Sequence, residues 1–348
     1  TWGTNKIIID SNGLNYQGDP DTYTVEYDTD GQTVSIVYSD ATVGWIPESD
    51  VDVTDAPSGT PTQKAIFGYG STGSYVSLTN LVNSSGVVAT DTTGVGTSRG
   101  GLTAAGYGID KALFGYGNTG SRVSITNLVN NSGVVAADVS GVGTARDGLA
   151  AAGYGTDKAI FGYGTTGSKT AITNLVSSSG VVASDVTGVG TARDGLAAAK
   201  YGTDKAIFGY GYTAAPSNSS LTNLVSNTGV VAADTTGVGS ARRALTATGY
   251  GEDKAIFGFG YTGSVVAITN LVSNTGVVAT DTSGVGTGRF DIAAAAYGGD
   301  KAIFAYGSTG SYSSLSNLVN NSGVVATDTT GVGSARAALA AAGYSVSA

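Results

Sequence analysis

Between residues 64 and 348, a unit of about 47 residues is repeated six times. The string KAIFGYG marks each copy, with small changes. It begins at Lys64, Lys111, Lys158, Lys205, Lys254 and Lys301. An Asn, an Asp and an Arg recur at the same step in every copy, and only the fourth copy differs in length, by two residues. A repeat this regular indicates six copies of one supersecondary unit.

Each copy contains four strand-like segments separated by Gly, Asn, Asp and Ser turns. In one copy they span 148–154, 158–164, 170–176 and 180–186, here called segments a, b, c and d. Four strands in a unit of this size predict one blade of a β-propeller. Segment a is rich in Ala and Gly, which suits an innermost strand beside a central channel. Its Ala and Leu also favour a short helix, but the flanking Gly residues argue for a strand.

The two ends of the repeat array complement each other. The first copy begins with segment b at Lys64, and nothing before it resembles segment a. The chain ends with a surplus segment a at 336–344. We therefore expect Leu339–Tyr344 to pair with Ala65–Tyr69, which would close a six-bladed propeller and remove both open sheet edges. An open solenoid is the alternative, but it gives no reason for the matching ends.

Composition favours an all-β protein and excludes several chemistries. The chain has 55 Gly, only 12% charged residues, and no Cys, Met or His. Disulfides, thiol nucleophiles and imidazole catalysis are thereby excluded. Residues 1–63 carry eleven acidic residues and one basic residue, whereas residues 64–348 carry fifteen and sixteen. Without a basic stripe or a long apolar run, neither nucleic-acid binding nor membrane insertion is expected.

The first 46 residues form a different segment. Strand-like runs at 6–10, 22–27 and 33–38, with a hairpin signal at Asp30-Gly31, predict a small β module. Three strands are marginal alone, so we expect this module to pack with upstream sequence or with copies of itself. Residues 47–63 are acidic and rich in Pro, Ser and Thr, which indicates a linker. Four carboxylates without EF-hand spacing could hold Ca²⁺ or simply form a solvated face: Asp19, Asp21, Asp28 and Asp30.

The repeats resemble Kelch propeller repeats. The shared features are Arg146, a small-residue strand, a hydrophobic strand ending at Gly162-Tyr163-Gly164, an Asn-hydrophobic strand and a Ser-Asn-Thr-Gly turn. The repeats lack the paired Gly-Gly and the outer-strand Trp of Kelch units. The resemblance implies a Kelch-like propeller over residues 64–348.

A second resemblance covers nearly the whole chain. The strings GLNYQG (13–18) and DGQTVSIVYSDATVGWIP (30–47), followed by the KAIFGYG repeats, resemble tail-fibre and other virion proteins of marine tailed bacteriophages. This resemblance implies a viral structural protein in a virion appendage. It also implies a homotrimer that contacts other virion proteins and, at its distal part, the host.

Motifs that suggest catalysis or cofactors have structural explanations. GYGSTG (68–73) matches the dinucleotide fingerprint, but the residues after it are strand-like, whereas that fingerprint must open a helix. We expect a turn there and no cofactor. The repeated Asp and Arg residues occur six times in identical positions, which favours ion pairs or hydrogen bonds between blades. The same reasoning applies to the repeated Lys residues and to the Asp residues before them. No catalytic residue and no metal site is predicted.

Differences among the six copies indicate where a ligand would bind. The turns between segments a and b and between c and d hardly change, whereas the b–c turn and the residue after the repeated Arg vary strongly. In an up-and-down blade these two variable places share one face, which is the expected place for recognition. Drift in idle loops is the alternative. The predicted receptor-binding residues are Tyr75, Arg122, Lys169, Asn218, Arg243, Phe290 and Tyr312.

The sequence therefore predicts a non-enzymatic virion appendage protein whose propeller binds a receptor on the host surface, a glycan or a protein. A bacterial lectin-like or adhesion propeller is the alternative. A glycan-cleaving enzyme is less favoured, because only Asp147 and Asp194 stand apart from the repeat as a pair of carboxylates.

Overall fold

A computed structural model describes residues 7–18, 25–27, 35–47, 63–214 and 217–345. Chain contacts divide the protein into two compact units, residues 1–60 and 61–348, which are described separately. All regular structure in the described residues is β-strand. No described segment is a helix long and apolar enough to cross a membrane.

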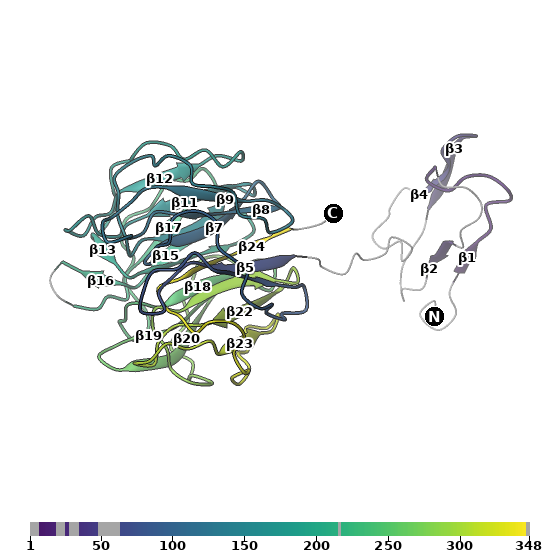
Figure 1. Ribbon diagram of the computed structural model, residues 1–348. Coiled ribbons are helices and arrows are strands. Elements are labelled where there is room, and N and C mark those ends of the chain that lie inside the picture. The colour runs from purple at the N-terminus through teal and green to yellow at the C-terminus, as the bar shows by residue number, and fades with distance from the viewer. Residues whose placement is uncertain (1–6, 19–24, 28–34, 48–62, 215–216, 346–348) are drawn as a thin grey trace. The chain divides into compact units, whose positions relative to one another are not determined.

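The larger unit contains six antiparallel sheets of three strands each (Figure 1). In strand order, sheet 1 is β24 (Ala340–Tyr344), β5 (Lys64–Gly68) and β6 (Thr79–Val82), and sheet 2 is β7 (Thr103–Tyr107), β8 (Lys111–Gly115) and β9 (Thr126–Val129). Sheet 3 is β10 (Ala150–Tyr154), β11 (Lys158–Gly162) and β12 (Thr173–Val176), and sheet 4 is β14 (Ala197–Tyr201), β15 (Lys205–Gly209) and β17 (Thr222–Val225). Sheet 5 is β18 (Thr246–Tyr250), β19 (Lys254–Tyr261) and β20 (Val265–Val272), and sheet 6 is β21 (Ala293–Tyr297), β22 (Lys301–Ala305) and β23 (Ser316–Val319). Two short strands, β13 (Arg193–Asp194) and β16 (Tyr212–Thr213), form a further pair.

The Ala-rich segments are strands, so the helical alternative is wrong. β7, β10, β14, β18, β21 and β24, here called the Ala-rich strands, contact one another in that order, and β24 also contacts β7. Small side chains are needed because neighbouring backbones come close. A Cβ atom added at Gly153 in sheet 3, for example, would lie 3.3 Å from the carbonyl oxygen of Gly106 in the preceding sheet.

The two ends of the repeat array pair with each other, as predicted. β24 pairs antiparallel with β5, with Tyr344 opposite Lys64 and Ala340 opposite Gly68 (Figure 1). The same register joins β10 to β11 in sheet 3, where Tyr154 lies opposite Lys158. Sheet 1 is therefore built like the others although its strands come from opposite ends of the repeat array.

Two cycles of backbone hydrogen bonds, which the sequence did not predict, link the six sheets. In the first cycle, the residue two positions before the Ala-rich strand donates its N–H to the equivalent carbonyl of the preceding sheet, at 2.8–3.0 Å. Its members are Gly101, Gly148, Gly195, Ala244, Asp291 and Ala338. The second cycle links the turns after these strands, at 2.7–2.8 Å. At the seam between the two ends of the repeat array, Gln63 supplies the carbonyl and Ser345 supplies the N–H group. In the other copies, one continuous turn supplies both groups.

The predicted fourth strand, segment d, is not a regular strand. In sheet 3 its ladder with β12 is reduced to isolated bridges, Thr173 to Val186 and Val176 to Val182. Between them the buried Asn174 side chain donates from Nδ2 to the Ala183 carbonyl at 3.0 Å and to Asp185 Oδ1 at 2.9 Å. A side-chain amide thus makes bonds that a continuous ladder would make between backbones, and the ladder is interrupted.

The repeated Arg, Asn and Asp residues have a structural role, but their hydrogen bonds lie within one sheet rather than between sheets, and they fix the loop that arrives from the preceding sheet. Arg146 is fully buried and donates to Tyr163 O, Thr144 O and Asn174 Oδ1 at 2.9, 3.0 and 2.6 Å. Its guanidinium carbon lies 4.4 Å from the centre of the Tyr116 ring in the preceding sheet. Three acceptors and an aromatic face compensate for removing the cation from water.

The same contacts cross the seam between the two ends of the repeat array. Arg336 donates to Tyr69 O at 2.9 Å and to Asn80 Oδ1 at 2.7 Å. Asp91 accepts hydrogen bonds from the backbone N–H and the hydroxyl of Ser334. The junction of the last copy with the first is thus equivalent to an internal junction.

The fingerprint-like sequence GYGSTG forms a turn, as expected. Tyr69 adopts a left-handed conformation, with φ of 64°, and is followed by the turn that leads to β6 rather than by a helix. The equivalent Tyr163 is buried, and its hydroxyl donates to Val189 O at 3.0 Å. Burial raises the pKa of Tyr163 to about 12, although Arg193 nearby opposes the rise.

The smaller unit contains four described strands rather than three. β1 (Ile7–Ile9) pairs with β2 (Val25–Tyr27), and β3 (Ile36–Asp40) pairs with β4 (Gly44–Pro47), a strand that was not predicted. Tyr16, Val25 and Tyr27 are its buried core. The expected hairpin turn at Asp30-Gly31, the four carboxylates considered for Ca²⁺ and nearly all of the 47–63 linker lie outside the described residues.

Candidate functional site

The variable b–c turns and the residues after the repeated Arg lie side by side. Backbone bridges join Asp147 to Thr165, Arg243 to Tyr261, and Phe290 to Ser308. The b–c turn of each copy therefore runs next to the variable residue that precedes the Ala-rich strand of the same sheet. We call this surface the variable face.

The variable face contains an open basin of about 810 Å³. Four of the seven predicted receptor-binding residues line it: Tyr75, Lys169, Arg243 and Phe290. Arg122, Asn218 and Tyr312 do not line it, although the first two contact residues that do. Tyr312 instead lies beside Ser71, with 3.4 Å between the two hydroxyl oxygens.

Two aromatic residues of the basin were missed. Tyr212 and Tyr261 also line it. Both occupy the first position of the b–c turn, where the other copies have Ser71, Asn118, Thr165 and Ser308. A comparison of the six copies at this position would have found them, since only these two copies place an aromatic ring there.

Cations and aromatic rings alternate along one side of the basin. Lys169 Nζ lies 4.7 Å from the centre of the Tyr212 ring, and the guanidinium carbon of Arg243 lies 4.4 Å from the same ring. Arg243 also lies 5.2 Å from the Tyr261 ring, whose centre is 6.0 Å from that of Phe290. We call these five residues the cation–aromatic ladder. Its contacts place the guanidinium beside two rings, which limits the motion of the Arg243 side chain.

The three predicted cations of the variable face differ in charge compensation. Arg122 Nε lies 2.8 Å from Asp147 Oδ1, and Lys169 Nζ lies 2.9 Å from both oxygens of Asp194. Among the described residues, Arg243 has no carboxylate within ion-pair distance. The one hydrogen bond that its side chain makes within the described residues is long, 3.4 Å from Nη1 to Asn218 Oδ1.

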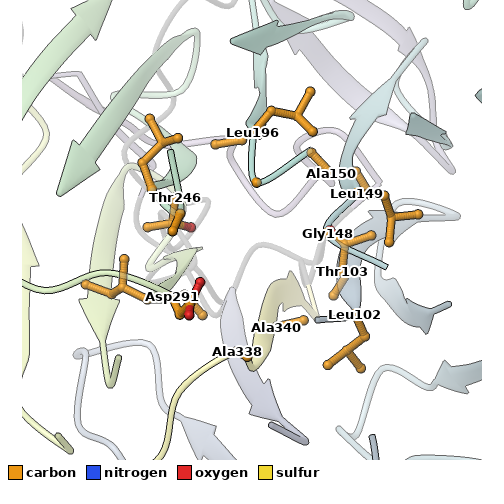
Figure 2. A pocket seen from close by; sticks show the side chains of 18 of the residues that line it. Leu102, Thr103, Gly148, Leu149, Ala150, Leu196, Thr246, Asp291, Ala338 and Ala340 are labelled. Atoms are coloured by element: carbon orange, nitrogen blue, oxygen red, sulfur yellow. The ribbon is translucent and has the colours of Figure 1, made fainter. Parts of the chain in front are cut away.

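Below the basin, a cavity of about 130 Å³ is lined by the first hydrogen-bond cycle and the Ala-rich strands. Figure 2 shows Leu149, Leu196 and Ala340 around it, with the carboxylate oxygens of Asp291 on its wall. Asp291 also lines the basin, so it lies where the two spaces meet. Burial raises the pKa of Asp291 to about 6, and the positive charge of Arg243 opposes the rise.

A second cavity, of about 330 Å³, lies against the other end of the Ala-rich strands. Lys200, which replaces a Gly of most other copies, lines it together with Gln63. Burial lowers the pKa of Lys200, whereas Asp204 nearby raises it. Among the described residues no group of three or more metal-ligating side chains was found.

The two carboxylates considered for hydrolysis, Asp147 and Asp194, both line the basin. Each is paired with a cation, so neither is positioned as a free acid or base. Comparisons with known proteins add no assignment, because no family model and no curated protein matches the chain.

Proposed function

We propose that residues 64–345 form a closed six-bladed β-propeller of Kelch-like repeats. The pairing of β24 with β5, the cyclic contacts of the Ala-rich strands and the two cycles of hydrogen bonds support this architecture. The Arg336 and Asp91 contacts across the seam support it as well. An open solenoid would leave these groups without partners at its two ends.

The proposed function is attachment to a host cell. In this proposal the protein is a non-enzymatic component of a virion appendage, such as a tail fibre, and its variable face binds a glycan on the host surface. The observation that carries the proposal is the concentration of copy-to-copy differences in one basin. That basin brings Lys169, Tyr212, Arg243, Tyr261 and Phe290 together on an otherwise constant scaffold.

The side-chain types of the basin suit a carbohydrate. Aromatic rings offer flat apolar surfaces on which sugar rings stack, and the Lys169–Asp194 pair offers hydrogen bonds to hydroxyl groups. One exposed hydrogen bond contributes only about 0.5–1.5 kcal/mol, so a single basin would bind weakly. A homotrimer would raise avidity if its copies engage together, which agrees with the resemblance to trimeric appendages.

A bacterial lectin-like adhesin would use the same basin and differs in where the protein resides. Immunogold labelling of purified virions separates the two: labelled appendages support the viral assignment, and unlabelled virions beside a labelled cell surface contradict it. A glycan-cleaving enzyme is less favoured because the charges of Asp147 and Asp194 are compensated by Arg122 and Lys169.

The binding proposal is tested by two triple variants that each remove three positive charges. The first is Arg122→Ser, Lys169→Ser and Arg243→Ser on the variable face. The control replaces Lys111, Lys205 and Lys254, which follow the turns at the other end of the sheets, by Ser. On an array of neutral and acidic bacterial polysaccharides, we expect the first variant to lose binding and the control to keep it.

The reverse pattern would show that the wrong face was chosen. Absence of binding by the unmodified protein to every glycan on the array, and to host cells, would contradict the proposed function itself. Circular dichroism of both variants verifies that the fold is retained.

A further inference from the structure

The charge compensation of the variable face points to one cation, Arg243, as a candidate anion-binding group. Arg122 and Lys169 already satisfy Asp147 and Asp194 at 2.8–2.9 Å. Arg243 is the exception, because among the described residues its side chain makes one hydrogen bond, the 3.4 Å contact with the neutral Asn218, and Asp291, which its charge influences, lies beyond ion-pair distance. A guanidinium carries five N–H donors, so most of the donor capacity of Arg243 is unused within the described residues.

The aromatic neighbours restrict the Arg243 side chain to a position from which it can bind a ligand. Its guanidinium lies over the Tyr212 ring at 4.4 Å and near the Tyr261 ring at 5.2 Å. Ring faces do not accept strong hydrogen bonds, so these neighbours leave the N–H groups of the guanidinium for an anion. The planar fork of donors matches carboxylate or sulfate oxygens, and a side chain already held in place loses less entropy on binding.

The surroundings of Arg243 suit a saccharide rather than a bare anion. Tyr212, Tyr261 and Phe290 continue the ladder on both sides of the guanidinium, and all line the basin. These rings could carry one or two sugar rings while the charged group reaches Arg243. The basin, at about 810 Å³, is large enough for a short oligosaccharide.

Resting on the proposed glycan-binding function, we infer that the cation–aromatic ladder binds an acidic saccharide whose carboxylate or sulfate group pairs with Arg243. The part of the basin lined by Asp147, whose charge is compensated by Arg122, then contributes hydrogen bonds to hydroxyl groups rather than charge recognition. Arg122 and Arg243 thus have different roles, although the sequence analysis predicted the same role for both.

The test measures the affinity of the full chain for four saccharides. Oligogalacturonate carries carboxylates, and its carboxyl-reduced form is the same chain without charge. Oligosaccharides of κ-carrageenan carry sulfate, and a neutral galactan oligosaccharide is their uncharged counterpart. We expect at least one acidic saccharide to bind about tenfold or more tightly than its neutral counterpart.

Three single variants identify the residue responsible. Arg243→Gln should weaken binding of the acidic saccharide about tenfold or more and abolish the preference over its neutral counterpart. Arg122→Gln removes a cation that is already paired with Asp147. The loss of affinity for the acidic saccharide should therefore be at least about fivefold smaller than in Arg243→Gln. Lys205→Gln, in the constant turns at the other end of the sheets, is the control for loss of one positive charge and should bind as the unmodified protein does.

The outcomes separate this inference from the proposed function. Equal affinity for acidic and neutral saccharides would overturn the acidic assignment and leave glycan binding standing. An acidic preference that survives Arg243→Gln, or that is lost instead in Arg122→Gln, would overturn the role of Arg243. Binding of none of the four by the unmodified protein would contradict the inference, and the polysaccharide array then decides on glycan binding itself.

Discussion

Asp291 is expected to lower the stability of the folded protein at neutral pH, and its replacement by Asn should raise it. Asp291 occupies a position of the first hydrogen-bond cycle where the other copies have only Gly or Ala. Its φ of 49° is left-handed, a conformation that Asn tolerates well, so the substitution keeps the backbone. It also keeps the size of the side chain while removing its charge.

The magnitude follows from the pKa of the carboxyl group. Burial raises the pKa of Asp291 from 3.8 to about 6, so folding favours the protonated form. Below about pH 4 the group is protonated in both states and costs nothing. As the pH rises through 4 to 6, the unfolded chain loses its proton first, and stability falls. Above pH 6 the loss reaches about 3 kcal/mol, because each tenfold difference in proton affinity between the folded and unfolded states corresponds to about 1.4 kcal/mol.

The assay is urea unfolding of the Asp291→Asn and unmodified proteins at pH 4 and pH 7.5. Circular dichroism is the suitable signal, because both Trp residues, Trp2 and Trp45, belong to the smaller unit. We expect the variant to be more stable by up to about 3 kcal/mol at pH 7.5 and nearly equal at pH 4. Asp194→Asn is the control, and it should not stabilise, since Asp194 is paired with Lys169. An Asp291→Asn variant with no gain at pH 7.5 would show that the ionised Asp291 carboxylate does not destabilise the fold.

Two further predictions concern the seam between the two ends of the repeat array. Deleting residues 336–348 should expose the edge of β5 and cause aggregation, detectable by light scattering; a soluble, monodisperse truncation would count against closure. Arg193→Met and Arg336→Met should each destabilise the fold by about 3–5 kcal/mol in urea unfolding, because each removes a fully buried cation from its acceptors. Because Arg336 makes across the seam the contacts that Arg193 makes within the array, a much smaller loss for Arg336→Met would argue that the seam is open.

Repetition explains why so much of the larger unit was predictable. Six copies of one pattern fix where strands begin, and the missing segment a before Lys64 predicted its pairing partner, β24. The prediction that segment d forms a regular strand was wrong, because the Asn174 side chain bonds to backbone and side-chain oxygens of that segment. The periodicity of the sequence cannot reveal this effect. The hydrogen-bond cycles were missed because they depend on left-handed residues such as Ala244, which composition does not mark. In the smaller unit, no repeat was available to reveal β4.

The candidate site was predictable only in outline. Differences among copies located the variable face and four lining residues of its basin. They did not show that Arg122 and Lys169 are compensated, since their partners Asp147 and Asp194 lie 25 residues away in sequence. The place of Asp291 at the junction of basin and cavity depends on contacts among several copies and could not be derived from one copy.

The closed arrangement of the six sheets is tested most directly by hydrogen exchange of the backbone amides. The seam strands β24 and β5 have the same register as β10 and β11, which serve as an internal reference. If the ring is closed, the amides of β24 and β5 should be protected to within about tenfold of those in β10 and β11, because they open only with the rest of the unit. Exchange of the β24 amides at rates typical of a fraying terminal strand, hundreds of times faster than in β10, would contradict the account.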